Sequence, residues 1–330
     1  MAFHQIVIFA VKRINKTSPM KKNILLLLSV LIFATGFGQS LIVEPADETF
    51  RQFMNTRDFT LSNDGQEAYF TVQNADGSQA VIVKAGFVNG NWGNFSMVPF
   101  TGKYRDIEPF LSPDNLRLYF SSNRPKDETI SEPADYDIWY VERTTVENEW
   151  SAPVNIGPPV NTSFNEFYPA VGASNNIYYT SDALTRTRKD DIFISEWEGS
   201  GYSTPFLLSD SINSPLYEFN AWISPDEEVL IYTVYNAPGG LGGGDLYISR
   251  KNEAGKFEKR ETLGNFINSD KLDYSPFYDI KNKTLYFTSS RNEISGIKVK
   301  TLEEFQKLND KYANGQSRIY KVKIELIPAD

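Results

Sequence analysis

The chain has 330 residues, with 33 lysines and arginines against 42 aspartates and glutamates, one histidine and no cysteine. The lack of cysteine excludes disulfides, thiolate metal ligands and cysteine nucleophiles. The length allows two medium domains or one large all-β domain.

The first 38 residues are typical of an export signal. Lys21 and Lys22 precede an apolar run over residues 24–33, and glycines stand at alternate positions, 36 and 38. The run is shorter than the roughly 20 residues that a membrane-spanning helix needs. We therefore expect a cleavable signal peptide at 1–38, with residues 1–19 as an upstream extension, and a periplasmic or secreted protein without a membrane span.

Removal of this segment changes the charge and the available chemistry. It takes away five basic residues, no acidic residue and His4, so 28 basic residues remain against 42 acidic ones, a net charge of −14. Nucleic acid and anionic membrane surfaces are thereby disfavoured as partners. Without histidine and cysteine, Ser-His-Asp and Cys-His catalysis are also excluded. We expect no catalytic residues and no resident cofactor.

The rest of the chain repeats with a period near 55 residues. Tyr- and Phe-rich segments recur around Phe70, Phe120, Tyr179, Tyr232 and Phe287, at intervals of 50, 59, 53 and 55 residues. Each is followed by a hydroxyl residue, and Ser-x-Asp turns precede three of them, at 62–65, 112–115 and 224–227. Such turns predict a β-hairpin around each marker strand.

Two further strands complete each unit. Asp137, Asp191 and Asp245 open β-branched and aromatic segments that predict a third strand, and a weaker version begins at Arg318. A polar turn and a short fourth strand follow. Repeated four-stranded antiparallel units predict an all-β fold, a β-propeller of five blades with six as the alternative, at about 57–105, 106–165, 166–217, 218–272 and 273–330.

The repeat resembles the WD40-like PD40 repeat of TolB-type propellers and of Bacteroidota-type envelope proteins. The resemblance rests on Ser112-Pro113-Asp114, on 120–124 (Phe-Ser-Ser-Asn-Arg), on 242–247 (Gly-Gly-Gly-Asp-Leu-Tyr) and on 287–291 (Phe-Thr-Ser-Ser-Arg). It implies a monomeric binding scaffold, although propellers host many functions. We expect residues 39–56, including Leu41-Ile42-Val43, to pair with the last blade and close the ring.

The long insertions all fall at one end of the predicted ring, where the connectors between blades and the loops between second and third strands meet. These loops are 125–136, 184–189 with Arg186 and Arg188, 238–244 and 292–316. The last contains a capping box, Thr301 to Glu304, followed by apolar residues at helical spacing, and it predicts one short helix. We expect its apolar stripe to pack on the propeller, with partner docking as the alternative.

Acidic residues recur at this same end. Asp106, Glu166, Glu218 and Asp273 occupy one equivalent position in four units. One interpretation is that each accepts backbone N–H bonds or pairs with an arginine at a strand end, such as Arg124 or Arg291. The other is a ligand or cation site, with Glu166, Glu218 and Asp273 as candidate calcium ligands.

The leading hypothesis is a non-enzymatic exported propeller that binds an envelope protein, peptide or glycan through the loop-bearing end. The candidate ligand-binding residues are Asp106, Glu166, Glu218, Asp273, Arg124, Arg186, Arg188 and Arg291. One alternative is a carbohydrate-active enzyme that uses the four carboxylates, because five-bladed propellers resemble glycoside hydrolase scaffolds. Another is a subunit of an envelope assembly, for which apolar surface patches are expected.

Overall fold

The predicted Ser-x-Asp turns close through one set of contacts. Ser62, Ser112 and Ser224 each donate their hydroxyl to the aspartate two residues later, at 2.6, 2.6 and 2.5 Å. Each hydroxyl also accepts the backbone N–H of the fifth residue along, at 2.9 Å. The serine therefore ties the start of the turn to the next strand, which fixes the hairpin register.

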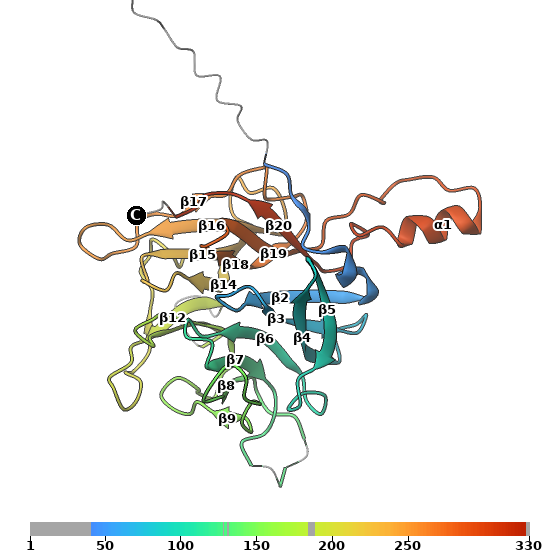
Figure 1. Cartoon of the computed structure of the whole chain (residues 1–330). Coiled ribbons are helices and arrows are strands. Elements are labelled where there is room, and N and C mark those ends of the chain that lie inside the picture. Colours follow the sequence, from blue (N-terminus) through green and yellow to red (C-terminus); the bar gives the residue numbers. More distant parts are fainter. Residues whose placement is uncertain (1–40, 128, 131, 184–188, 328–330) are drawn as a thin grey trace, which may run out of the picture. The chain divides into compact units, whose positions relative to one another are not determined.

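Twenty strands form five four-stranded antiparallel sheets, shown in a computed structural model that describes residues 41–327 except 128, 131 and 184–188 (Figure 1). Blade 1 contains β2 (Asn55–Leu61), β3 (Glu67–Gln73), β4 (Ala80–Val88) and β5 (Asn91–Met97). Blade 2 contains β6 (Asp106–Leu111), β7 (Arg117–Ser122), β8 (Asp137–Glu142) and β9 (Val154–Asn155). Blade 3 contains β10 (Glu166–Val171), β11 (Ile177–Ser181), β12 (Asp191–Ser195) and β13 (Phe206–Leu207).

Blade 4 contains β14 (Tyr217–Ile223), β15 (Val229–Tyr235), β16 (Gly244–Arg250) and β17 (Glu261–Thr262). Blade 5 contains β18 (Asp273–Asp279), β19 (Thr284–Ser289), β20 (Arg318–Lys323) and, from the other end of the chain, β1 (Glu44–Pro45). The first strands of neighbouring blades contact each other in a closed cycle, β2 to β6 to β10 to β14 to β18 and back to β2. They therefore line the axis, and the prediction of a five-bladed propeller is confirmed.

The N-terminal segment supplies the outer strand of blade 5. Glu44 and Pro45 pair with Lys321 and Tyr320, directly after the predicted Leu41-Ile42-Val43. The Ala46 N–H then donates to the Ile319 carbonyl at 2.9 Å. A short helix, η1 (Glu48–Gln52), follows and buries Phe50 against blade 1. The segment thus joins the last blade to the first.

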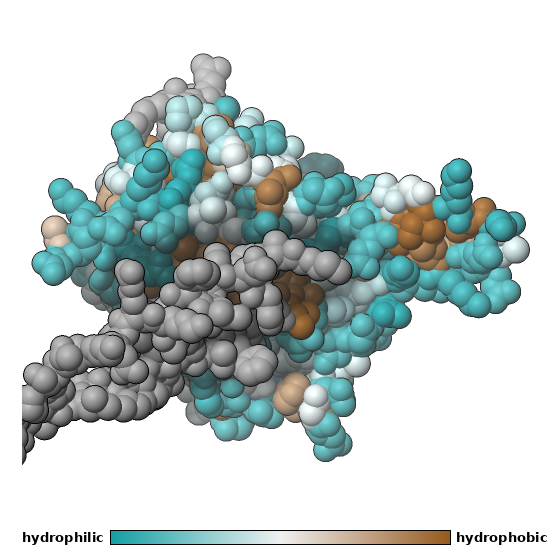
Figure 2. Space-filling model, turned by 90° about the horizontal axis from the view of Figure 1, so that it is seen from above, coloured by the Kyte–Doolittle hydropathy of each residue, from teal (hydrophilic) through white to brown (hydrophobic). Residues whose placement is uncertain are grey.

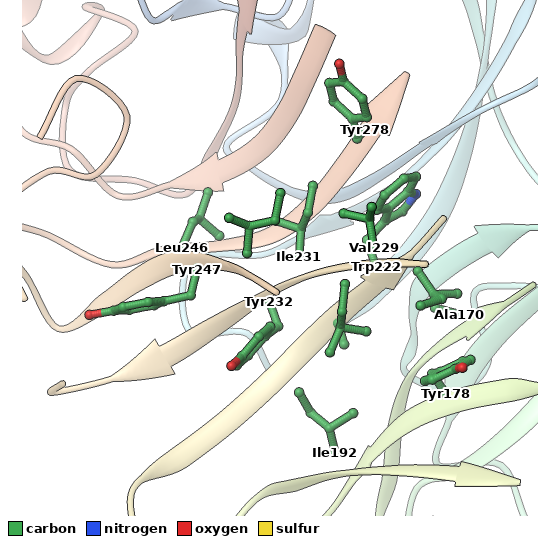
Figure 3. Packing of buried hydrophobic residues seen from close by; sticks show 14 of the residues in the cluster. Ala170, Tyr178, Ile192, Trp222, Val229, Ile231, Tyr232, Leu246, Tyr247 and Tyr278 are labelled. Atoms are coloured by element: carbon green, nitrogen blue, oxygen red, sulfur yellow. The ribbon is translucent and has the colours of Figure 1, made fainter. Parts of the chain in front are cut away.

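The hydroxyl that follows the marker residue joins neighbouring blades in four of the five units, whereas the Thr233 hydroxyl has no partner among the described residues. Thr71, Ser121, Thr180 and Thr288 each accept a backbone N–H from the first strand of the next blade, at 3.0, 3.1, 3.1 and 3.1 Å. Apolar side chains fill the space between the sheets, as Figure 3 shows for Trp222, Ile231 and Leu246 of blade 4 and Ile192 of blade 3. Both faces of each blade are buried in this way. The second strand of each blade is therefore apolar on both sides, without the alternation of a half-exposed strand.

Two helices interrupt the described strands: η1 and α1 (Leu302–Asn309). Thr301 caps α1, because its hydroxyl accepts the Glu304 N–H at 3.1 Å. The single short α-helix is therefore where the capping box predicts it. Within the described residues, no helix has the length and apolarity needed to cross a membrane.

Candidate functional site

The four connector carboxylates, Asp106, Glu166, Glu218 and Asp273, begin the innermost strands β6, β10, β14 and β18 and have no exposed surface. Three of them bind the turn that precedes their strand. The Thr162 N–H and hydroxyl donate to Glu166 at 3.1 and 2.6 Å, and Ser214 and Ser269 do the same for Glu218 and Asp273. Each carboxylate therefore holds its own connector instead of pointing to a common centre.

Arginines neutralise three of these carboxylates. Arg124 reaches Asp106 at 2.6 Å and Arg291 reaches Asp273 at 3.1 Å, and both guanidinium groups stack on aromatic rings of their own blades. Arg260, which the sequence pattern does not single out, lies 3.2 Å from Glu218. Buried carboxylates held by cations and N–H groups are stabilising parts of a fold.

Glu166 differs from the other three because no ion-pairing cation reaches it among the described residues. Burial raises the pKa of Glu166 to about 7, the neighbouring Asp137 and Asp135 add to the rise, and hydrogen bonds from Thr162 oppose it. The loop that carries Arg186 and Arg188 lies outside the described residues. The described part of the chain holds no group of three or more acidic or histidine side chains placed to bind a metal ion, so calcium at this end stays a prediction.

A second polar cluster, missed by the sequence analysis, lies on the axis. Each innermost strand contains one bulge residue in the left-handed backbone region, and none of the five is a glycine. They are Asp58, Glu108, Tyr168, Asn220 and Ser275, with φ of 60°, 59°, 45°, 52° and 49°. Left-handed backbone is unfavourable for Glu108, Tyr168 and Ser275 and less so for aspartate and asparagine, and hydrogen bonds around the axis help to hold it in place.

Arg57 is the centre of this axial cluster, which comprises Arg57 and the five bulge residues. Its guanidinium binds Asp58 at 2.7 Å and Glu108 at 2.8 Å. Asp58 also accepts the Ser275 hydroxyl at 2.7 Å, and Glu108 accepts the Tyr168 N–H at 2.8 Å. Burial raises the pKa of Glu108, and the charge of Arg57 opposes that rise.

The axial cluster closes the channel. The Tyr168 hydroxyl of blade 3 donates to the Pro276 carbonyl of blade 5 at 2.9 Å, so the tyrosine crosses the axis. Asp58 and Glu108 are almost completely buried, and several donors satisfy their oxygens. A carboxylate acid or base must reach a substrate, and this arrangement gives neither group an open path. The sequence holds one signal of these bulges: a proline, at position 109, 169 or 276, directly follows three of the five bulge residues.

The arm, residues 292–316, is the largest insertion between the second and third strands of a blade. Its base is fixed, since the Glu293 N–H donates to Ala313 at 2.9 Å and the Tyr312 hydroxyl donates to Ile319 at 2.7 Å. Its helix α1 has no buried residue, and the arm extends away from blade 5 (Figure 1). The prediction that the apolar stripe packs on the propeller is wrong: only Tyr312 is buried, while Phe305 is 48% exposed.

Comparison with known proteins identifies the fold and no family. No family model matches the chain, and no curated protein matches it in sequence. Among solved structures, a glycoside hydrolase gives a TM-score of 0.55 at 10% identity, covering 88% of this chain and 91% of the other. The α-L-arabinofuranosidase PaAbf62A from Podospora anserina, in complex with cellotriose, gives 0.52 at 12% identity, covering 86% and 96%.

TolB-like propellers are also among the structural neighbours. TolB from Acinetobacter baumannii gives a TM-score of 0.45 at 10% identity, covering 81% of this chain and 54% of TolB. At such identities the likeness to the glycoside hydrolase and to the arabinofuranosidase extends to the fold alone.

Proposed function

We propose that this protein is an exported, non-enzymatic propeller that binds a protein partner through the connector face, the end that carries the blade connectors and the arm. The proposal rests on the arm. Its base is fixed at Glu293 and Tyr312, and its tip, residues 297–305, leaves apolar side chains exposed. Ile297, Val299, Leu302 and Phe305 are 48%, 38%, 72% and 48% exposed. Figure 2 shows apolar surface gathered on the arm, apart from the propeller body.

A partner protein with an apolar groove fits this tip. Exposed leucine and phenylalanine on a short helix are typical of helix-in-groove recognition, in which a few apolar anchors supply most of the binding free energy. A pocket of about 410 Å³ lies beside the arm and β1, and its lining includes Arg51, Arg291, Lys307 and Lys311 against Glu293 and Asp310. The excess of cations favours an acidic rim around the partner's groove.

Site-specific crosslinking in cells tests this proposal. A photoreactive phenylalanine analogue at position 305 should give one discrete adduct in the envelope fraction, whose partner mass spectrometry identifies. Val146 is the matched control, since it is 44% exposed but lies in the β8–β9 turn, at the opposite end of the ring. Leu302→Ser in the same chain should abolish the adduct. Identical adducts at 305 and 146, or none at 305, would contradict partner binding through the arm.

A glycoside hydrolase is the second candidate function. It is favoured by two of the structural neighbours with TM-scores above 0.5, a glycoside hydrolase and an α-L-arabinofuranosidase. Against it stand the internal bonds of Asp58 and Glu108 and of the connector carboxylates. Hydrolysis of aryl arabinofuranosides or of plant polysaccharides that is lost in Glu108→Gln would favour this candidate over the binding function.

A further inference from the structure

The end of the propeller opposite the connector face carries a pocket of about 410 Å³ on the axis. Every blade contributes to its wall, through Leu61, Phe110, Val171, Trp222 and Phe277. In each strand these residues stand two or three positions after the left-handed residue of the axial cluster. Because Tyr168 crosses the axis in that cluster, the pocket is closed at its inner end and opens only toward the hairpin turns.

The mouth of the pocket is already fixed by hydrogen bonds between neighbouring turns. The Asn63 N–H donates to the Asn115 side chain at 3.2 Å, and the Asn63 amide donates to the Pro113 carbonyl. On the other side, the Ala173 N–H donates to the Pro225 carbonyl at 2.8 Å. Linked turns give a rigid opening, so a ligand would not have to order the protein when it binds.

The chemistry of the wall is apolar. Phe110, Trp222 and Phe277 supply aromatic surface, and Asn63 and Asp279 at the mouth bond within the protein, while Lys281 also lines the pocket. The carboxylate of Asp279 accepts two bonds from Asn282, at 3.0 and 2.8 Å. Recognition in this pocket therefore depends on burial of apolar surface and contact between rings, which is the usual composition of small-molecule sites of this volume.

We infer that this axial pocket binds a small, uncharged molecule built on one or two apolar rings. The site is independent of the arm, since the two lie at opposite ends of the ring, and its ligand differs in class from the protein partner proposed above. The turn-lined mouth and the closed inner end suit a free small molecule better than a protein surface.

Binding of N-phenyl-1-naphthylamine, an uncharged dye that fluoresces in apolar surroundings, tests the inference on the full chain. We expect one saturable site, with sensitised emission excited through Trp222. Ile280 lines the mouth and is 39% exposed, so Ile280→Glu places a charge at the entrance without disturbing the core. That variant should weaken binding by about tenfold or more, since the ring loses apolar burial against a charged group.

Three controls make the result specific. Leu302→Ser with Phe305→Ser removes the two exposed apolar side chains of α1, at 72% and 48% exposure, and should leave the dye affinity unchanged. Trp222→Phe should lower the sensitised emission to the part that the other four tryptophans supply and keep the affinity within about threefold, a change of less than 1 kcal/mol. If Ile280→Glu unfolds, Ile280→Trp fills the mouth instead and should also weaken binding. Unchanged affinity in a folded Ile280 variant, loss of binding in the arm variant, or no saturable site would overturn the inference.

Discussion

At the scale of single residues, Glu166 differs from its equivalents because no ion-pairing cation reaches its carboxylate among the described residues. Its three equivalents, Asp106, Glu218 and Asp273, have an arginine within 3.2 Å, whereas the described residues give Glu166 only Thr162. Burial without a counter-charge favours the protonated form, which explains why its pKa is raised to about 7.

The raised pKa predicts a stability that depends on pH. Protonated Glu166 favours the folded state, so its contribution is complete below the ordinary pKa of 4.5 and is lost as the pH rises through about 7. Glu166→Gln should match the wild type near pH 4.5 and exceed its free energy of unfolding by roughly 2 kcal/mol at pH 8. Urea unfolding at both pH values measures this difference.

Glu218→Gln is the matched control. Burial raises the pKa of Glu218 as well, but bonds from Ser214 and the charge of Arg260 oppose the rise. Glu218→Gln leaves Arg260 without its partner, so it should bring a smaller gain at pH 8 than Glu166→Gln, or none. If the two substitutions change the free energy of unfolding equally at pH 8, burial at the blade connector, and not the lack of an ion pair, accounts for the pH dependence at Glu166.

The axial cluster predicts a larger effect for Arg57. Arg57→Leu leaves Asp58 and Glu108 buried without their shared cation, and we expect the free energy of unfolding to fall by roughly 3 to 5 kcal/mol. Arg51→Leu removes an exposed ion pair with Glu48 and should cost less than about 1 kcal/mol. Denaturant titration followed by tryptophan fluorescence measures both; a small effect of Arg57→Leu would show that other donors suffice for the two carboxylates.

At the scale of elements, we expect the base of the arm to contribute to the free energy of unfolding and its helix α1 to contribute to partner binding. Tyr312 is 5% exposed and packs on Tyr320 with ring centroids 5.3 Å apart. Tyr312→Ala should therefore lower the free energy of unfolding by roughly 3 kcal/mol. Leu302→Ala and Phe305→Ala should each change it by less than about 0.5 kcal/mol, because neither side chain is buried. Thermal unfolding of the three variants checks this, and similar losses at the tip and the base would indicate that the helix packs on the propeller in solution.

The elements also show what sequence alone can and cannot predict. Strands, turns and the helix follow from local patterns, such as the Ser-x-Asp turns and the capping box at Thr301. Whether α1 packs on the propeller depends on the base of the arm, which the spacing of Phe305 and Leu308 does not encode. The bulge residues were missed because left-handed backbone at Asp58 or Tyr168 depends on bonds to other blades, and no glycine marks these positions.

At the scale of the whole molecule, ring closure depends on very few residues. The outermost strand of blade 5 comes from the other end of the chain: Glu44 and Pro45 pair with β20, and the Ala46 N–H adds one more bond to it. Lys321 strengthens the junction, since its ammonium donates to the Ala46 carbonyl at 2.9 Å. Without this segment β20 becomes an exposed strand edge, which invites pairing with a second chain.

Deletion of residues 39–46 should therefore lower the melting temperature by several degrees and produce concentration-dependent association, because both the closing pairs and the cover of β20 are lost. Deletion of 39–43 retains Glu44 and Pro45 but removes Leu41 and Val43, which pack against the core. It should therefore lower the melting temperature less than deletion of 39–46 and leave the monomeric mass unchanged. Differential scanning calorimetry and light scattering at two concentrations distinguish these outcomes. If both deletions behave like the wild type, contacts between the innermost strands β18 and β2 suffice to hold the ring, and β1 serves only as a cover.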